Sequence, residues 1–291
     1  MQADFEIVEV FGTGAALTGG PLGVVIGDLG ADDAVLQRLA ARLAMPETVI
    51  LDRHGDDGTV AVRIFTPYVE LGFAGHPLLG AAAVAVRHTL VSPGDVALRT
   101  REGTVHAYVS PDAGTAHLAE RTCHVGAPLG VGVEAICAAV GLPEGAAAGP
   151  VRVASAGLAF ACLPVDSVHL EEARALPADV AALPGRLPDL SEVFGVAVFV
   201  PRLPRVRARV FVPEPLCAED PATGSAALAI AGWLAQAHGF GAEPARFDVV
   251  QGSAELGLSH LRVRARKTDE SHVLASVGGS VRRLVHGRLT L

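Results

Sequence analysis

The stretch Arg63–Pro77 (RIFTPYVELGFAGHP) recurs in outline later in the chain, at Arg209–Ala226 (RVFVPEPLCAEDPATGSA). Each copy reads Arg-x-Phe-x-Pro, then a loop containing glycine, and then an apolar run rich in alanine. Arg209 follows Arg63 by 146 positions and Gly224 follows Gly75 by 149, close to half of the 291 residues. The sequence therefore predicts an internal duplication, with one strand, loop and helix unit in each half. Chance likeness between two alanine-rich helices is the alternative.

The flanking pattern predicts alternating strands and helices in both halves. Helices are expected over 34–44, capped by Asp32 or Asp33, over 78–88, over 226–237, and in a proline-rich stretch over 170–194. Strands are expected over 5–11, 22–26, 48–51, 60–65, 151–155, 158–165, 195–200 and 206–212, and in a tail over 261–291 that is broken at Asp269, Gly278-Gly279 and His286-Gly287.

The helices that follow the two loops are apolar on every side, which requires burial all round. We therefore predict an α+β fold of two pseudo-symmetric domains, each a β-barrel-like sheet wrapped around a central helix. The first domain is assigned to residues 1–118, completed by the terminal strand 281–291, and the second to 119–280. Arg63 and Arg209 hold equivalent strand positions, where we expect structural pairing.

The composition argues against some classes of binding partner. The chain has 23 Lys+Arg and 31 Asp+Glu, for a net charge of −8, which argues against nucleic acid and anionic membranes. The basic stretch Arg202–Arg209 alternates with apolar residues and is interpreted as a strand with one solvated face. The four cysteines and eleven histidines, His54 among them, lack metal-ligand spacing, so no metal is expected and the cysteines are interpreted as reduced apolar residues. The acidic start MQADFEIVEV does not resemble a signal peptide, and a cytoplasmic protein is expected.

The two loops place small and polar residues at helix starts, where unpaired N–H groups and a partial positive charge favour anions. The first supplies Ala74, Gly75 and His76, and the second Asp220, Thr223, Gly224 and Ser225. Such starts suit a small carboxylate or a developing oxyanion. Neither loop matches a dinucleotide or Walker fingerprint, and Ser225 lacks the GxSxG elbow of a hydrolase nucleophile.

The segments Arg63–Gly80 and Glu219–Ala226, with Pro46-Glu47-Thr48 before them, resemble the PhzF-like family of the diaminopimelate-epimerase-like fold. The resemblance spans essentially the whole chain. It implies two pseudo-symmetric domains with the active site between them, and a homodimer. It also implies an isomerase without a cofactor, in which one glutamate moves a proton between carbons of a small unsaturated or cyclic carboxylic acid.

The resemblance also implies the roles of individual residues. The family's glutamate falls on Glu47, and its supporting His, Asp and Ser fall on His76, Asp220 and Ser225. Gly75 and Gly224 would hold the ligand carboxylate through backbone N–H groups, with Ala74 and Thr223 beside them. The matched loops contain no cysteine, which disfavours racemisation by a cysteine pair.

Other interpretations remain open for the same residues. Glu47 could be a surface turn residue, His76 a capping residue and Asp220 a loop-stabilising residue, while Glu219 is placed at the surface or behind the site. The protein could also be an epimerase with Asp220 as a second base, or a small-acid-binding protein without catalysis. The sequence has Gly19-Gly20-Pro21 where the family usually has Gly-Asn-Pro, and Ser253–Ser259 replaces its usual basic and glycine-rich residues. These departures bear on the family's ordinary substrate more than on its chemistry.

Overall fold

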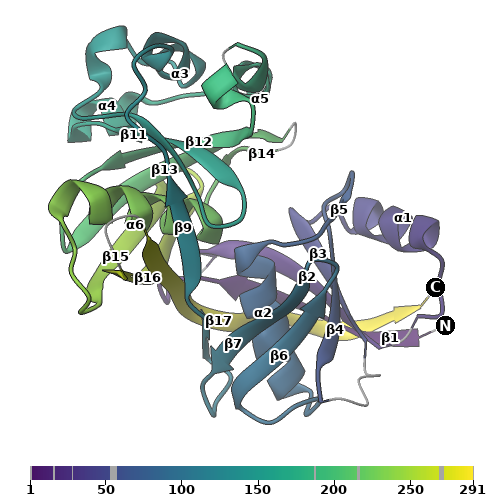
Figure 1. The fold of residues 1–291 in the computed structure, drawn as a ribbon. Helices are drawn as coiled ribbons and strands as arrows, with labels where there is room; N and C mark the ends of the chain where they lie inside the picture. Colours follow the sequence, from purple (N-terminus) through teal and green to yellow (C-terminus); the bar gives the residue numbers. More distant parts are fainter. Residues whose placement is uncertain are drawn as a thin grey trace. The chain divides into compact units, whose positions relative to one another are not determined.

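The computed structural model describes residues 2–15, 17–27, 29–52, 58–186, 188–214, 217–268 and 272–290. Two compact units make up the chain (Figure 1). Unit 1 comprises Met1–Ala119 with Gly278–Leu291, and unit 2 comprises Glu120–Val277. The sequence predicted these divisions after residues 118 and 280. His54 and Asp269, named above, lie outside the described residues.

Unit 1 is a closed sheet around one helix. Its elements are β1 (Gln2–Val10), β2 (Gly20–Ile26), α1 (Asp33–Leu43), β3 (Glu47–Asp52), β4 (Val60–Phe65), β5 (Glu70–Leu71), α2 (Gly75–Arg87), β6 (Gly94–Thr100), β7 (Gly103–Val109), β8 (Thr115–Leu118) and the second part of β17 (Val273–Thr290). Among the described residues, strands pair in the ring β1–β2–β3–β4–β6–β7–β8–β17 and back to β1. Helix α2 runs inside this ring, and every one of its residues except Arg87 is buried (Figure 1).

Unit 2 repeats the plan. Its elements are β9 (Arg121–Val125), α3 (Val133–Ala139), β10 (Arg152–Ser155), β11 (Ala159–Pro164), α4 (Ser167–Glu172), α5 (Pro177–Ala181), β12 (Val193–Val200), β13 (Arg205–Glu214), β14 (Cys217–Asp220), α6 (Gly224–His238), β15 (Ala245–Ser253), β16 (Gly257–Lys267) and the first part of β17, with short 3-10 turns at Glu144–Ala146, Leu183–Gly185 and Pro188–Leu190. Helix α6 is buried from Gly224 to Ala235.

The strand pairings confirm the predicted duplication and fold class. The order β1–β2–β3–β4–β6–β7 alternates antiparallel and parallel pairs, and β10–β11–β12–β13–β15–β16 has the same order and the same alternation. Arg63 lies in β4 and Arg209 in the equivalent β13. The two halves are therefore two copies of one architecture, as the loops and helices predicted.

A second layer covers the outside of each sheet. In unit 1, Leu36 and Leu39 of α1 pack with Val25, Ile50 and Phe65 on the outer face of β2, β3 and β4. The N-cap of α1 is Asp32, as expected, and its carboxylate accepts a hydrogen bond from the N–H of Val35. In unit 2 the outer face of β11, β12 and β13 is covered by α3, α4, α5 and the 3-10 turns. Each sheet is thus held between a central helix and an outer helical layer.

Both central helices begin earlier than predicted. Helix α2 starts at Gly75, not near Leu78, and α6 starts at Gly224, not at Ala226. Glycine and proline near the start suggested a longer loop. Pro77 falls within the first turn, however, where the missing N–H would have no partner within the helix. The loops therefore deliver their residues into the first helical turn itself.

The proline-rich stretch 170–194 is helical in short pieces, as α4, α5 and two 3-10 turns before β12 begins at Val193, because its prolines interrupt helical hydrogen bonding. One prediction for the tail was wrong. The tail is not broken at Gly278-Gly279 or His286-Gly287, because β17 is continuous over 18 residues. A Cβ at Gly278 would lie 1.9 Å from the His117 Nδ1 and 2.6 Å from the Ala116 carbonyl oxygen. Gly278 thus allows the close approach of β8 rather than a turn.

The basic stretch is also more buried than predicted. In β13, Arg205 is exposed and Arg207 half-buried, but Arg209 is only 4% exposed. Among the described residues, no helix combines the length and the apolar character needed to cross a membrane.

Candidate active site

Glu47 is the first residue of β3 and lies on the inner face of the unit 1 sheet. Its neighbour in the parallel β2 strand is Leu22. A Cβ placed on Gly80 of α2 would lie 2.4 Å from the Leu22 Cδ2 atom, so Leu22 points at the central helix. Because directly paired residues of neighbouring strands share a face, Glu47 points the same way. The structure therefore aims this carboxylate into the barrel and not outward to a surface turn.

The side chain that Glu47 meets is His76, the second residue of α2. The Glu47 Oε2 and His76 Nε2 atoms are 3.6 Å apart, and the side chains are 17% and 5% exposed. This distance exceeds that of a hydrogen bond but falls within ion-pair range. The two groups are thus close enough for both to reach one small ligand atom beside them. A partly buried acid next to an imidazole is a common arrangement for moving protons.

The first turn of α2 surrounds this pair. Ala74 is the N-cap in extended conformation, and the first helical hydrogen bond runs from the Leu78 N–H to the Ala74 carbonyl at 3.2 Å. Ala74, Gly75 and His76 are all buried. The N–H groups of a first helical turn have no acceptor within the helix and carry partial positive charge. This end of α2 can therefore receive a carboxylate within reach of Glu47 and His76.

The residues predicted in unit 2 gather around the first turn of α6. Asp220 ends β14, and its two carboxylate oxygens accept hydrogen bonds from the Ala222 N–H at 2.9 Å and the Thr223 hydroxyl at 2.7 Å. Thr223 is the N-cap, and Gly224 and Ser225 are the first two helical residues. The structure thus brings Asp220, Thr223, Gly224 and Ser225 together, with the Asp220 carboxylate bound to its own loop.

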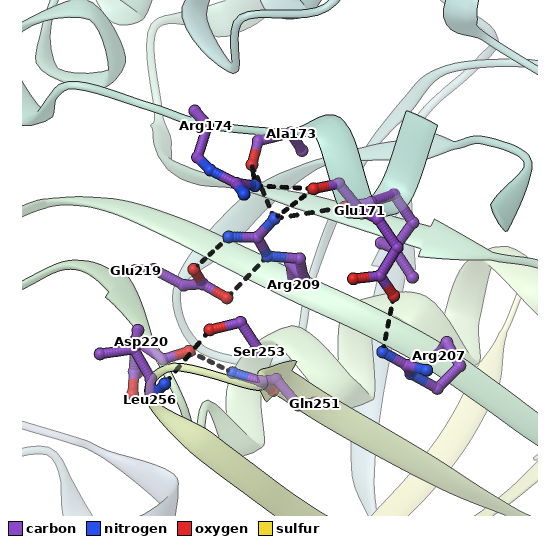
Figure 2. A network of polar contacts seen from close by, with 11 residues as sticks. Glu171, Ala173, Arg174, Arg207, Arg209, Glu219, Asp220, Gln251, Ser253 and Leu256 are labelled. Carbon is purple, nitrogen blue, oxygen red and sulfur yellow. Dashed lines mark hydrogen bonds and ion pairs between the residues drawn. The ribbon is translucent and has the colours of Figure 1, made fainter. Parts of the chain in front are cut away.

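Gln251 belongs to the same loop network and was not among the predicted site residues. It is fully buried, and its amide nitrogen donates to the Asp220 carbonyl at 2.7 Å (Figure 2). The same nitrogen donates to the Thr223 hydroxyl at 2.9 Å. Its amide oxygen accepts from the Thr223 N–H at 3.2 Å. The available signal in the sequence is that Gln251 directly follows the apolar pair Val249-Val250, where a buried amide would need several hydrogen-bond partners.

The two units differ at the position of the glutamate. Thr48 pairs with Phe65 in unit 1, and Val196 pairs with Phe211 in unit 2, so Glu47 corresponds to Gly195. A Cβ at Gly195 would lie 2.5 Å from the Phe211 carbonyl oxygen. Unit 2 therefore has neither a carboxylate nor room for one at this position, and the acid belongs to unit 1 alone.

The equivalent arginines pair as structural residues, as predicted. Arg63 forms two hydrogen bonds with Glu70, and Arg209 forms two with Glu219. These bonds raise the pKa of both guanidinium groups above their usual value. Glu219 is buried at 8% exposure, so it is not a surface residue. Among the described residues, no cluster of three or more His, Cys, Asp or Glu side chains could hold a metal ion.

The comparisons with known proteins define the class as isomerases. Over 301 residues the chain is 32% identical to an uncharacterized isomerase of Mesorhizobium japonicum, covering 98% of both chains. It is 29% identical over 297 residues to the trans-2,3-dihydro-3-hydroxyanthranilate isomerase of Pseudomonas chlororaphis, covering 99% of this chain and 98% of that protein.

The chain belongs to the phenazine biosynthesis-like protein family PhzC-PhzF, whose model matches residues 8–286. The crystal structure of a PhzF-family phenazine biosynthesis protein from Bacillus anthracis has the same fold, with a TM-score of 0.87, 16% identity and full coverage of both chains. The protein is thus a PhzF-like isomerase, as the paired motifs predicted.

Proposed function

We propose that the protein isomerises a small unsaturated, cyclic carboxylic acid by moving one proton between two of its carbon atoms, with Glu47 as the base. The observation that carries this proposal is the Glu47–His76 pair, 3.6 Å apart and largely buried at the first turn of α2. The name of the Pseudomonas chlororaphis relative supplies a candidate substrate, trans-2,3-dihydro-3-hydroxyanthranilate.

The reaction balances without a second reactant. The Glu47 carboxylate removes a proton from a carbon next to a double bond, and the electron pair spreads over the three-carbon system. The Glu47 carboxylic acid then returns the proton to the far carbon, so the double bond has moved and the base is regenerated. His76 hydrogen-bonds to a substrate oxygen or nitrogen and fixes the ring beside Glu47. The substrate carboxylate binds at the N-terminal turn of a central helix, where Gly75 or Gly224 offers its N–H.

One base explains the asymmetry between the units better than two. An epimerase needs acid and base groups on opposite faces of the carbon, and the position equivalent to Glu47 is the crowded Gly195. Asp220, the other candidate for a second base, has both oxygens engaged by Ala222 and Thr223. These contacts favour Asp220 as a residue that orders the loop, and they favour return of the proton to the same face.

The test uses trans-2,3-dihydro-3-hydroxyanthranilate in heavy water. Turnover by the wild-type protein should place deuterium at a single product carbon, to the extent that the Glu47 carboxylic acid exchanges its proton with solvent before returning it. Glu47→Gln should lower kcat by at least about 10²-fold, the lower end of what general acid–base catalysis contributes. Glu134→Gln, at an exposed position of α3, is the matched control and should keep full activity. Full turnover by Glu47→Gln would remove Glu47 as the base, and an epimerised product would support the two-base alternative.

A further inference from the structure

We propose that Arg63–Glu70 and Arg209–Glu219 form a duplicated pair of clamps, whose residues position the first turns of α2 and α6 for catalysis. Each clamp joins the outer helical layer of its unit to the segment that enters the central helix. The catalytic consequence rests on the proposed function, whereas the effect on local structure does not.

The clamp of unit 2, whose contacts Figure 2 shows, is the more buried one. The Arg209 and Glu219 side chains are 5% and 9% exposed, with Nε–Oε1 and Nη2–Oε2 distances of 2.8 and 2.5 Å. The Arg209 Nη1 atom also donates to the Ala173 carbonyl at 2.7 Å, just after α4. Glu219 directly precedes Asp220, so one guanidinium ties the end of α4 to the loop that Gln251 and Thr223 also hold.

The clamp of unit 1 has the same construction. Arg63 donates from Nε and Nη2 to Glu70 at 2.8 and 2.6 Å, and its Nη1 lies 2.8 Å from the Asp33 carboxylate in the first turn of α1. Arg101 adds a second contact to Glu70, at 3.1 Å. In each unit the third guanidinium nitrogen therefore contacts the outer helical layer, while the other two hold the glutamate.

The register of the two clamps is also the same. Glu70 pairs with Phe65, and Glu219 pairs with Phe211, so each glutamate lies opposite the phenylalanine two residues after its arginine. Each guanidinium also covers that ring, at 5.0 Å for Arg63 over Phe65 and 5.2 Å for Arg209 over Phe211. Arginine, phenylalanine and glutamate thus occupy the same face in the same geometry twice.

Chain length after the clamp is constant, and chain length before it is not. Glu70 lies five residues after Phe65, whereas Glu219 lies eight residues after Phe211 (70 − 65 and 219 − 211). From glutamate to the first helical glycine the spacing is five in both units (75 − 70 and 224 − 219). The two hairpins differ in length by three residues, whereas the number of residues from the clamp glutamate to the helix start is the same in both units. A purely structural ion pair would not require this constancy, but a device that sets the helix start would.

Stability alone is a weak reason for a buried ion pair. Replacing such a pair by apolar residues of similar volume is often neutral or stabilising, because the cost of desolvating the charges disappears. What apolar residues cannot reproduce is the directional link from one guanidinium to a glutamate and to the outer layer at once. Removing both charges together should therefore affect the position of the helix start and leave the stability of the fold nearly unchanged.

The experiment compares the double variants Arg209→Met/Glu219→Leu and Arg63→Met/Glu70→Leu with a control pair in unit 2. The control is Arg266→Met/Glu120→Leu, which removes an equally bidentate pair that is 32% and 37% exposed. Amide hydrogen exchange is followed in peptides covering residues 222–226 and 72–79, together with the thermal midpoint. Exchange needs no substrate, so it remains informative even if the proposed reaction is wrong.

Each clamp variant should keep its thermal midpoint within a few degrees and speed exchange at its own helix start by about tenfold or more. It should leave the other helix start unchanged. With trans-2,3-dihydro-3-hydroxyanthranilate, kcat/KM should fall by roughly 10- to 100-fold, as expected for small misplacement of the groups that bind and act on the substrate. The control should change neither exchange nor kcat/KM. If a double variant does not fold, Glu219→Gln or Glu70→Gln should show the same local effect more weakly.

Unchanged exchange at both helix starts in folded clamp variants would overturn the proposal. So would faster exchange that spreads evenly over the unit with a large loss of thermal midpoint, which would mark a general structural role. If wild type does not turn over the substrate while exchange changes as expected, the clamp assignment stands and the proposed function fails.

Discussion

Replacing Gly80, in the middle of α2, by alanine should lower the free energy of unfolding in the wild-type protein and raise it in the Leu22→Ala variant. Glycine inside a helix costs about 0.5–1 kcal/mol relative to alanine, so Gly80→Ala would stabilise an isolated helix. Here a Cβ would lie 2.4 Å from the Leu22 Cδ2 and 3.2 Å from the Val10 Cγ2. Favourable carbon contacts begin near about 3.5 Å, so the added methyl overlaps Leu22 by roughly 1 Å.

Leu22 is fully buried and cannot move aside freely. Overpacking of this kind costs about 1–3 kcal/mol, which exceeds the gain in helix propensity. Gly80→Ala should therefore lower the free energy of unfolding by about 1 kcal/mol. Leu22→Ala alone should lower it by about 2–5 kcal/mol through the cavity it leaves. In that background Gly80→Ala should raise stability, because the clash is gone and the helix gain of about 0.5–1 kcal/mol remains.

The assay is a double-mutant cycle by urea denaturation. Far-UV circular dichroism follows both units, while fluorescence of Trp233, the one tryptophan of the chain, follows unit 2. The coupling energy should be about 2 kcal/mol, within the range for residues in contact. The Trp233 transition should stay where it is in all three variants. Stabilisation by Gly80→Ala in the wild-type background, or a coupling energy near zero, would refute the close packing inferred for α2 and β2.

Two further predictions follow from pKa shifts. Burial raises the pKa of the Cys123 thiol to about 12 and also raises the pKa of the Cys162 thiol. Neither thiol should therefore react with a thiol reagent at pH 8 until the protein is denatured. Rapid labelling of either cysteine in the native protein, measured by mass spectrometry, would contradict this. The hydrogen bond from Arg266 lowers the pKa of Glu120, so this pair stabilises the fold above the carboxyl's unfolded value of 4.5, and the contribution is lost as the pH falls through the lower folded value. Arg266→Ala should slightly lower the urea midpoint at pH 7 and leave it unchanged at pH 2, and equal effects at both pH values would argue against the ion pair.

The duplication was predictable because both copies carry the same local chemistry. Arg63 and Arg209 each begin a motif whose proline, glycine and alanine run are visible without any tertiary information. Asp32 was identified as a candidate cap for a similar reason, since an acidic residue before an apolar periodic stretch is a local signal.

Other features depend on tertiary contacts that no local pattern contains. Gly278 is typical of a turn in the sequence, but it lies within a continuous strand, where the close approach of β8 leaves no room for a side chain. The burial of Arg209 and the role of Gln251 likewise depend on partners 10 and 28–31 residues away. Glu47 was found by its resemblance to the family, and only the register with Leu22 establishes that it points inward.

The path of β17 has a consequence for the order in which the protein is made. Residues Val273–Ala275 pair with β9 in unit 2, and the same strand then continues through unit 1 until Thr290 pairs with Gln2. The ribosome therefore synthesises all of unit 2 before it makes the part of β17 that pairs with β1 and completes the unit 1 barrel. The barrel of unit 1 can close only once Gly278–Leu291 have been made, so Glu47 acquires its finished surroundings only after all of unit 2 has been synthesised.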